Sequence, residues 1–99
     1  MDHAALDRAT ILARLARAEG HVIDGERQIV RQREIVAELE DAGAGRSAAA
    51  KIAREFLYSA ELAQRGHIVH RDQLKSLVDP ADAERTINSV RYSANRPDH

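Results

Sequence analysis

Histidines are the residues of this 99-residue chain whose type and spacing could support chemistry. An imidazole ring binds transition metals and changes its charge near neutral pH, so a histidine cluster can form a metal site or a pH-sensitive contact. The candidate metal ligands are His3, His21, His67 and His70. Carboxylate ligands could come from three acidic residues close to His21 in sequence, namely Glu19, Asp24 and Glu26. Whether these groups meet depends on the elements that carry them.

The first element is a long helix, expected over residues 4–41. This segment has no proline, and its apolar and small residues alternate at spacings of four and three, which is the pattern of a helix that packs along one face. The positions of this seam are Ile11, Leu15, Ala18, Val22, Gly25, Ile29, Gln32, Val36 and Leu39. Ile23 and Val30 lie off the seam and indicate a second apolar stripe.

A turn is expected at residues 42–47, because Gly43 and Gly45 end a helix readily and Ser47 is a good N-cap for the next one. The second helix is expected over 48–78, and Phe56 is its one bulky aromatic placed to fill the joint. The predicted seam of this helix is Ala49, Ala53, Phe56, Ala60, Ala63, His67, His70, Leu74 and Leu77.

Beyond the second helix, Asp79 and Pro80 predict a cap followed by a proline at the first helical position. A short third helix is therefore expected over about 80–90. Residues 1–92 form a single helical domain in this interpretation, and residues 93–99 form a flexible tail.

Two long helices joined by a short turn run antiparallel. Folding the chain about Ala44 places residue n beside residue 88 minus n, so that His21 lies opposite His67 and Ala18 lies opposite His70. Three histidines then share one level of the hairpin. The sequence leaves open whether they bind a metal, act as hydrogen-bonded spacers or form a pH-sensitive contact. The Glu-x-x-His motifs of ferritin-like metal bundles are absent.

The composition favours a helical chain that completes its core with a second copy. Hydrophobic residues make up 43% of the chain but aromatic residues only 3%, so the core of one small domain is thin. The second apolar stripe would remain exposed to solvent in an isolated hairpin. We therefore expect an all-α fold, a long antiparallel hairpin with a short C-terminal helix, that forms a homodimeric four-helix bundle.

The distribution of charge and the absence of several motifs argue against several classes of function. Fifteen basic and sixteen acidic residues are interspersed, which argues against nucleic-acid binding and favours a solvated, ion-paired surface for the 13 arginines. The sequence has no membrane-spanning apolar run, no signal-peptide pattern and no cysteine, which predicts a cytoplasmic protein of bacterial type. No nucleophile elbow, phosphate-binding glycine loop or His-Glu-x-x-His motif is present, so we expect no enzymatic activity.

Two stretches carry a family resemblance: Gly25–Glu40, which reads GERQIVRQREIVAELE, and His67 with Arg71, Asp72 and Leu74. They resemble a large group of short, uncharacterised bacterial proteins with the pattern G-E-R-x-I-x-R-Q-R-E-x-x-A-E-L-E followed by H-x-x-x-R-D-x-L. The resemblance covers roughly residues 12–77 and implies a helical hairpin without implying an activity. This chain departs from the pattern in its glycine-containing turn and in His70, where an acidic residue is usual.

A fainter similarity connects residues 12–22 and 67–70 with nickel- and copper-sensing helical repressors. That family binds metal through an N-terminal histidine, a cysteine on the second helix and a later histidine. His3 and His67 match by position and type, but the cysteine is absent.

The first functional hypothesis is a non-enzymatic, oligomeric protein-interaction module that forms a homodimer and has an unknown protein partner. The alternative is a metal- or small-ligand-responsive regulator that uses the four candidate histidines. No cofactor is expected in the first case, and a divalent transition metal is the cofactor implied by the second.

Overall fold

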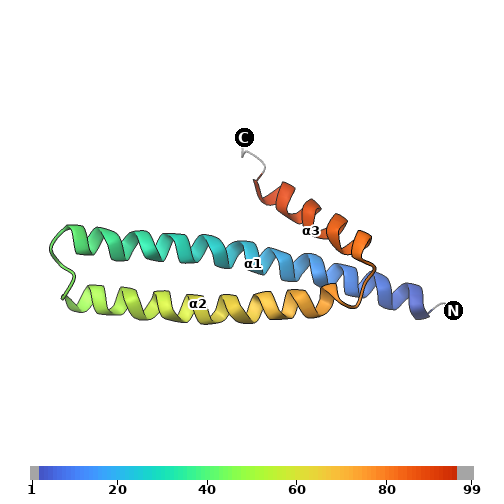
Figure 1. Cartoon of the computed structure of the whole chain (residues 1–99), viewed down its shortest axis with the longest axis horizontal. Coiled ribbons are helices and arrows are strands. Elements are labelled where there is room, and N and C mark those ends of the chain that lie inside the picture. The colour runs from blue at the N-terminus through green and yellow to red at the C-terminus, as the bar shows by residue number, and fades with distance from the viewer. Residues whose placement is uncertain (1–2, 96–99) are drawn as a thin grey trace.

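The computed structural model describes the backbone of residues 3–95 and the side chains of residues 7–95, and its described part is all-helical. Helix α1 spans His3–Asp41, α2 spans Ala48–Lys75 and α3 spans Pro80–Asn95. The helices α1 and α2 form a long antiparallel hairpin, and α3 lies against α1 near the open end of the hairpin (Figure 1). None of these helices is long and apolar enough to cross a membrane.

The turn between α1 and α2 follows the predicted chemistry. Gly43 has a left-handed backbone with φ of 78°, and the Ala44 N–H donates to the Leu39 carbonyl at 2.8 Å, which closes α1. Ser47 caps α2, because its hydroxyl accepts a hydrogen bond from the Ala50 N–H at 3.1 Å. The expected turn at residues 42–47 is confirmed.

The second turn differs from the expected one. Helix α2 ends at Lys75 rather than near residue 78, because Ser76 caps it and the chain then bends so that Val78 packs against the core. The Asp79 carboxylate accepts a hydrogen bond from the Ala81 N–H at 2.8 Å and opens α3 at Pro80, as predicted.

Helix α3 continues to Asn95, five residues beyond its expected end. Residues 93–95 therefore belong to α3 and not to a flexible tail, while residues 96–99 lie outside the described part. The polar side chains near the end of α3 gave no apolar spacing from which this extra length could be predicted. The side chain of Arg27 on α1 donates to the Ala94 carbonyl at 2.7 Å and supports this last turn.

The α1 seam is confirmed, because its nine positions are all buried or half-buried. The α2 seam is only half right. One face holds the buried and half-buried positions Ala50, Ala53, Leu57, Ala60, Gln64, His67, Arg71 and Leu74 of α2 and Val78 just after it, and Glu61, Ile68 and Lys75 are half-buried beside this face. The predicted set shares Ala53, Ala60, His67 and Leu74 with this face. Each of its other positions comes one residue before a residue that lies on the face. Phe56 and Leu77 are consequently 59% and 64% exposed, so the expectation that Phe56 fills the joint is wrong.

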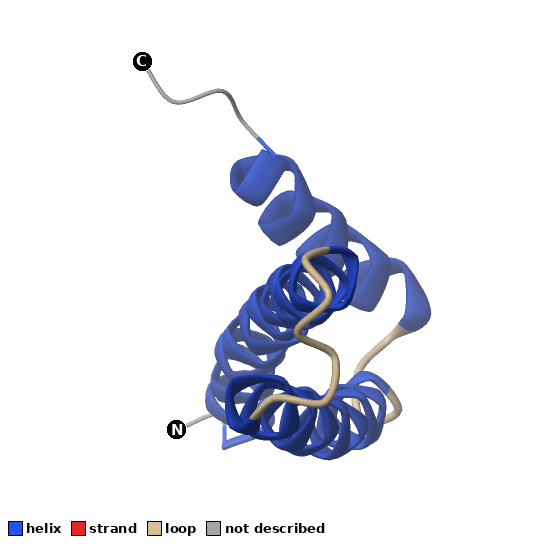
Figure 2. Cartoon of the chain, turned by 90° about the vertical axis from the view of Figure 1, so that its left-hand side faces the viewer, coloured by secondary structure: helices blue, strands red, loops and turns tan. Residues whose placement is uncertain are grey.

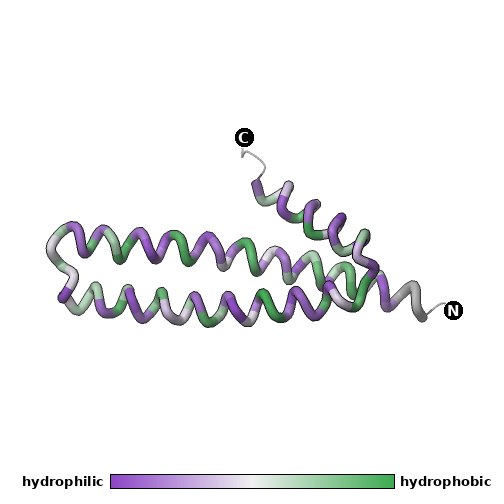
Figure 3. Tube along the Cα trace, viewed as in Figure 1, coloured by the Kyte–Doolittle hydropathy of each residue, from purple (hydrophilic) through white to green (hydrophobic). Residues whose placement is uncertain are grey.

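The largest buried cluster lies where all three helices meet. It contains Leu15, Ala18, Leu74, Ala83 and Ile87. Figure 2, which views the hairpin from its turn end, shows α3 on one side of α1, and Figure 3 shows hydrophobic segments alternating with hydrophilic ones along both long helices. Helix α3 thus covers part of the second apolar stripe that a partner chain was expected to cover: Ile23 is buried, whereas Val30 stays 53% exposed.

Candidate functional site

The histidine level predicted from the sequence exists. The rings of His21 and His67 stack with their centroids 5.5 Å apart and an interplanar angle of 21°. His70 lies one turn further along α2 and lines a surface hollow together with His21. His67 is half-buried in the α1–α2 joint, while His21 and His70 are exposed, so the expected place of His70 in the buried seam is wrong.

A metal centre is not assembled by one copy within residues 7–95, where no three His, Asp or Glu side chains gather closely enough to hold an ion. His3 lies outside the residues whose side chains are described. Of the nearby acidic residues, Asp24 and Glu26 are exposed and Glu19 is held by arginines. The stacked pair of His21 and His67 remains as the part of the cluster that could hold a metal.

The hollow beside the stacked histidines, which we call the basic hollow, is lined by Arg14, Arg17, Ala18, His21 and His70 and has a volume of about 370 Å³. Four of its lining residues come from α1, where Arg14, Arg17 and His21 follow one another at spacings of three and four residues, and His70 reaches it from α2. Ala18 is 3% exposed, and its small side chain leaves the space between the longer ones. The lining has four side chains that are or can become positive and no carboxylate.

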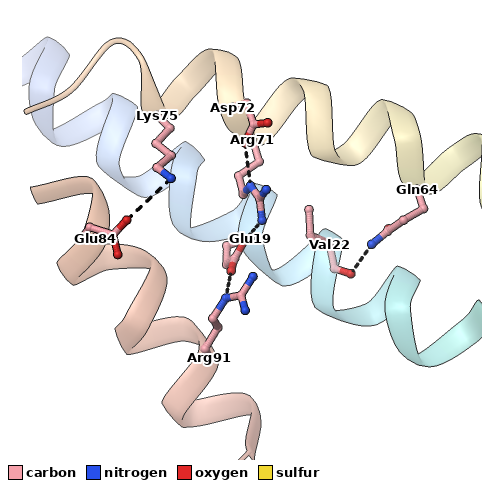
Figure 4. A network of polar contacts seen from close by, with 8 residues as sticks. All are labelled: Glu19, Val22, Gln64, Arg71, Asp72, Lys75, Glu84 and Arg91. Atoms are coloured by element: carbon pink, nitrogen blue, oxygen red, sulfur yellow. Dashed lines mark hydrogen bonds and ion pairs between the residues drawn. The ribbon is translucent and has the colours of Figure 1, made fainter. Parts of the chain in front are cut away.

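A second polar feature joins the three helices (Figure 4). The side chain of Glu19 on α1 is fully buried, and its two oxygens accept hydrogen bonds from Arg71 of α2 at 3.0 Å and from Arg91 of α3. Arg71 also contacts Asp72 at 3.1 Å. A buried carboxylate is costly unless it is paired, and these two guanidinium groups satisfy both of its oxygens. The network therefore fixes the relative position of α1, α2 and α3.

The pKa of Arg71 reflects this position. Partial burial acts to lower it, but the hydrogen bonds to Glu19 and Asp72 and the attraction of both carboxylates outweigh that effect. The pKa of Arg71 therefore lies above its usual value, and the guanidinium keeps its charge at every physiological pH.

Gln64 makes a third contact across the hairpin. Its amide donates to the Val22 carbonyl at 2.8 Å, and the side chain is buried against Gly25 of α1. A methyl group at Gly25 would overlap the Gln64 amide, so the glycine provides the space for this contact. The Oε1 atom of Gln64 has no hydrogen-bond partner among the described residues.

Sequence reasoning offered Glu19 only as a possible metal ligand and assigned no role to Gln64 or Arg91. A signal for Glu19 was present, because it lies four residues after Leu15 and four before Ile23, at the border of two apolar faces. An acidic residue in that place needs a cationic partner. Nothing in the spacing identifies Arg91 as that partner, since it lies 72 residues away.

No protein-family model, curated protein or solved structure matches the chain.

Proposed function

We propose that the chain is a non-enzymatic interaction module whose first partner is a second copy of itself, in a four-helix bundle. The observation that carries this proposal is the position of Phe56. Its ring is 59% exposed and lies at the edge of a hollow of about 380 Å³ between α1 and α2, which we call the turn-end hollow. The lining of this hollow is Gln28, Gln32, Phe56, Ser59, Ala60 and Ala63, without a charged side chain.

A projecting aromatic side chain beside a hollow with small residues suits an isologous contact. In a two-fold symmetric dimer, each copy offers the same surface, so the Phe56 of each copy can enter the turn-end hollow of the other. Ile52, which lies one turn before Phe56 and is 50% exposed, extends this surface. The net charge of −1 at pH 7 adds little repulsion between copies.

The length of the hairpin is sufficient for a stable interface. An antiparallel overlap of about 25 residues is about 37 Å long, and two helices side by side are about 20 Å wide. The product, roughly 740 Å² on each copy, is close to the 800 Å² per partner that is typical of specific interfaces. The overlap leaves the open end of the hairpin and α3 free for other contacts.

The test compares two exposed aromatic residues of the same helix. Phe56→Asp removes an apolar anchor from both copies at once, and burying one Phe contributes about 1.5–3 kcal/mol. We expect the dimer dissociation constant, measured by analytical ultracentrifugation, to rise at least about 100-fold. Tyr58→Asp is the control, because Tyr58 is 63% exposed but does not line the turn-end hollow. A wild-type monomer at high concentration, or equal effects of both variants, would refute the proposal.

A second candidate function, a metal- or small-ligand-responsive regulator, is favoured by the stacking of His21 on His67 with His70 close by. In the metal version the two stacked imidazoles bind the ion, and water or a second molecule supplies the remaining ligands. Titration of tag-free protein with Ni²⁺ and Zn²⁺, with His21→Gln as the comparison, tests this version. It fails if binding is weaker than about 10 μM or is unchanged in the variant.

A further inference from the structure

We infer that the basic hollow is a binding site for a small phosphate-bearing anion. This inference refines the small-ligand version of the second candidate function and is independent of dimerisation. It starts from the charge of the lining, which combines two arginines and two histidines with no acidic side chain.

Arg14 and Arg17 form no ion pair with an acidic side chain in the described part of the chain. Six other arginines there form ion pairs with Asp or Glu. Three other surface hollows of the described part contain arginine or lysine, and each of them also contains a carboxylate. These mixed hollows are lined by Arg27 and Arg31 with Glu26 and Glu34, by Lys51 and Arg54 with Glu55, and by Arg85 with Asp82. Charge of one sign therefore accumulates in the basic hollow although the whole chain is nearly neutral.

The same charge argues against a cation at this place. Two permanent positive charges beside His21 and His70 repel a divalent metal. Of the acidic residues close to His21 on the same helix, Glu19 is paired with Arg71 and Arg91, and neither Glu19 nor Asp24 lines the hollow.

The geometry fits a phosphate group. Arg14, Arg17 and His21 follow one another at spacings of three and four residues, which places them on one face of α1, and His70 closes the opposite wall from α2. Guanidinium groups bind phosphate oxygens through paired hydrogen bonds, and the N–H of an imidazole adds a single donor. Stacking on His67 holds the His21 ring in place before the ligand arrives. A diphosphate, with its several oxygens, can use donors from both helices.

The test is a calorimetric titration of the full chain with sodium pyrophosphate near neutral pH, at constant ionic strength. We expect a dissociation constant below about 1 mM, and a loss of at least about tenfold in Arg14→Gln/Arg17→Gln. The control is Arg31→Gln/Arg65→Gln, which removes the same charge from residues outside the basic hollow. His70→Gln gives a second reading at an exposed position if the arginine variant does not fold.

Three results would overturn the inference. One is the absence of binding up to about 10 mM pyrophosphate. Another is an equal loss of affinity in the control variant, which would indicate general screening of charge. The third is tight binding of Zn²⁺ with no binding of pyrophosphate, which would make the cluster a cation site. Phe56→Asp should bind pyrophosphate as the wild type does, so failure of the dimer proposal and failure of the anion site are distinguishable.

Discussion

Because Gly25 packs against Gln64, we expect replacement of glycine by alanine to destabilise the protein at Gly25 but to stabilise it at other helical glycines. Replacing glycine by alanine within a helix normally stabilises a protein by about 1 kcal/mol, because glycine loses more conformational entropy on folding. This gain requires space for the new methyl group. Gly20 and Gly66 have that space, since a Cβ atom at either position would have no neighbour within 4 Å. Gly20→Ala and Gly66→Ala should each raise the free energy of unfolding by about 0.5–1 kcal/mol.

Gly25→Ala should do the reverse. The new methyl group overlaps the buried amide of Gln64, which is 6% exposed and donates to the Val22 carbonyl. Displacing this amide costs one hydrogen bond, about 1 kcal/mol, and overpacking a tight joint adds about 1–3 kcal/mol. After the gain in helix propensity is subtracted, a net destabilisation of about 1–3 kcal/mol remains.

Thermal and urea unfolding followed by circular dichroism measure these differences, and 1 kcal/mol corresponds to about 4–8 °C in a domain of this size. The background variant Gln64→Ala makes the test specific, because Gly25→Ala should become stabilising once the long side chain is gone. The reasoning is refuted if Gly25→Ala stabilises the wild-type protein, or if its effect is the same in both backgrounds.

Further predictions concern the polar contacts. Glu19→Gln should lower the unfolding free energy by about 2 kcal/mol, since it removes the charge that pairs with a largely buried Arg71. Arg91→Gln should lower it by only about 1 kcal/mol, because Arg91 is 46% exposed and Glu19 keeps its ion pair with Arg71. Both values are obtained from urea unfolding, and equal effects would contradict the assigned roles. Ser47→Ala should cost about 1 kcal/mol through loss of the α2 cap, and Ser47→Gly less. The Arg33–Glu61 pair is exposed, so a double-mutant cycle should give less than about 0.5 kcal/mol.

The sequence was a good guide where apolar spacing was unambiguous. The full α1 seam, the turn and the caps at Ser47 and Asp79 were predicted, because they depend on local periodicity and side-chain chemistry. The pairing of His21 with His67 followed from the turn position alone.

The α2 face was misjudged for a physical reason. Phe56 and Leu77 are more hydrophobic than Gln64 and Arg71, yet the latter pair occupies the joint. Their burial depends on a glycine and a carboxylate of another helix, and hydrophobic periodicity within α2 carries no information about these partners. The basic hollow was missed similarly, since it combines side chains of two helices.

The Glu19 network has a consequence for how α3 finds its position. The faces that α3 and α1 present to each other include alanines, and small side chains create shallow ridges along which a helix could shift by a turn at little cost. A shift of one turn would carry Arg91 away and leave Glu19 dehydrated beside a single cation. The observed register places Arg91 beside Glu19 and satisfies both carboxylate oxygens. The ion pair therefore disfavours displacement of α3 along α1 and favours a single register.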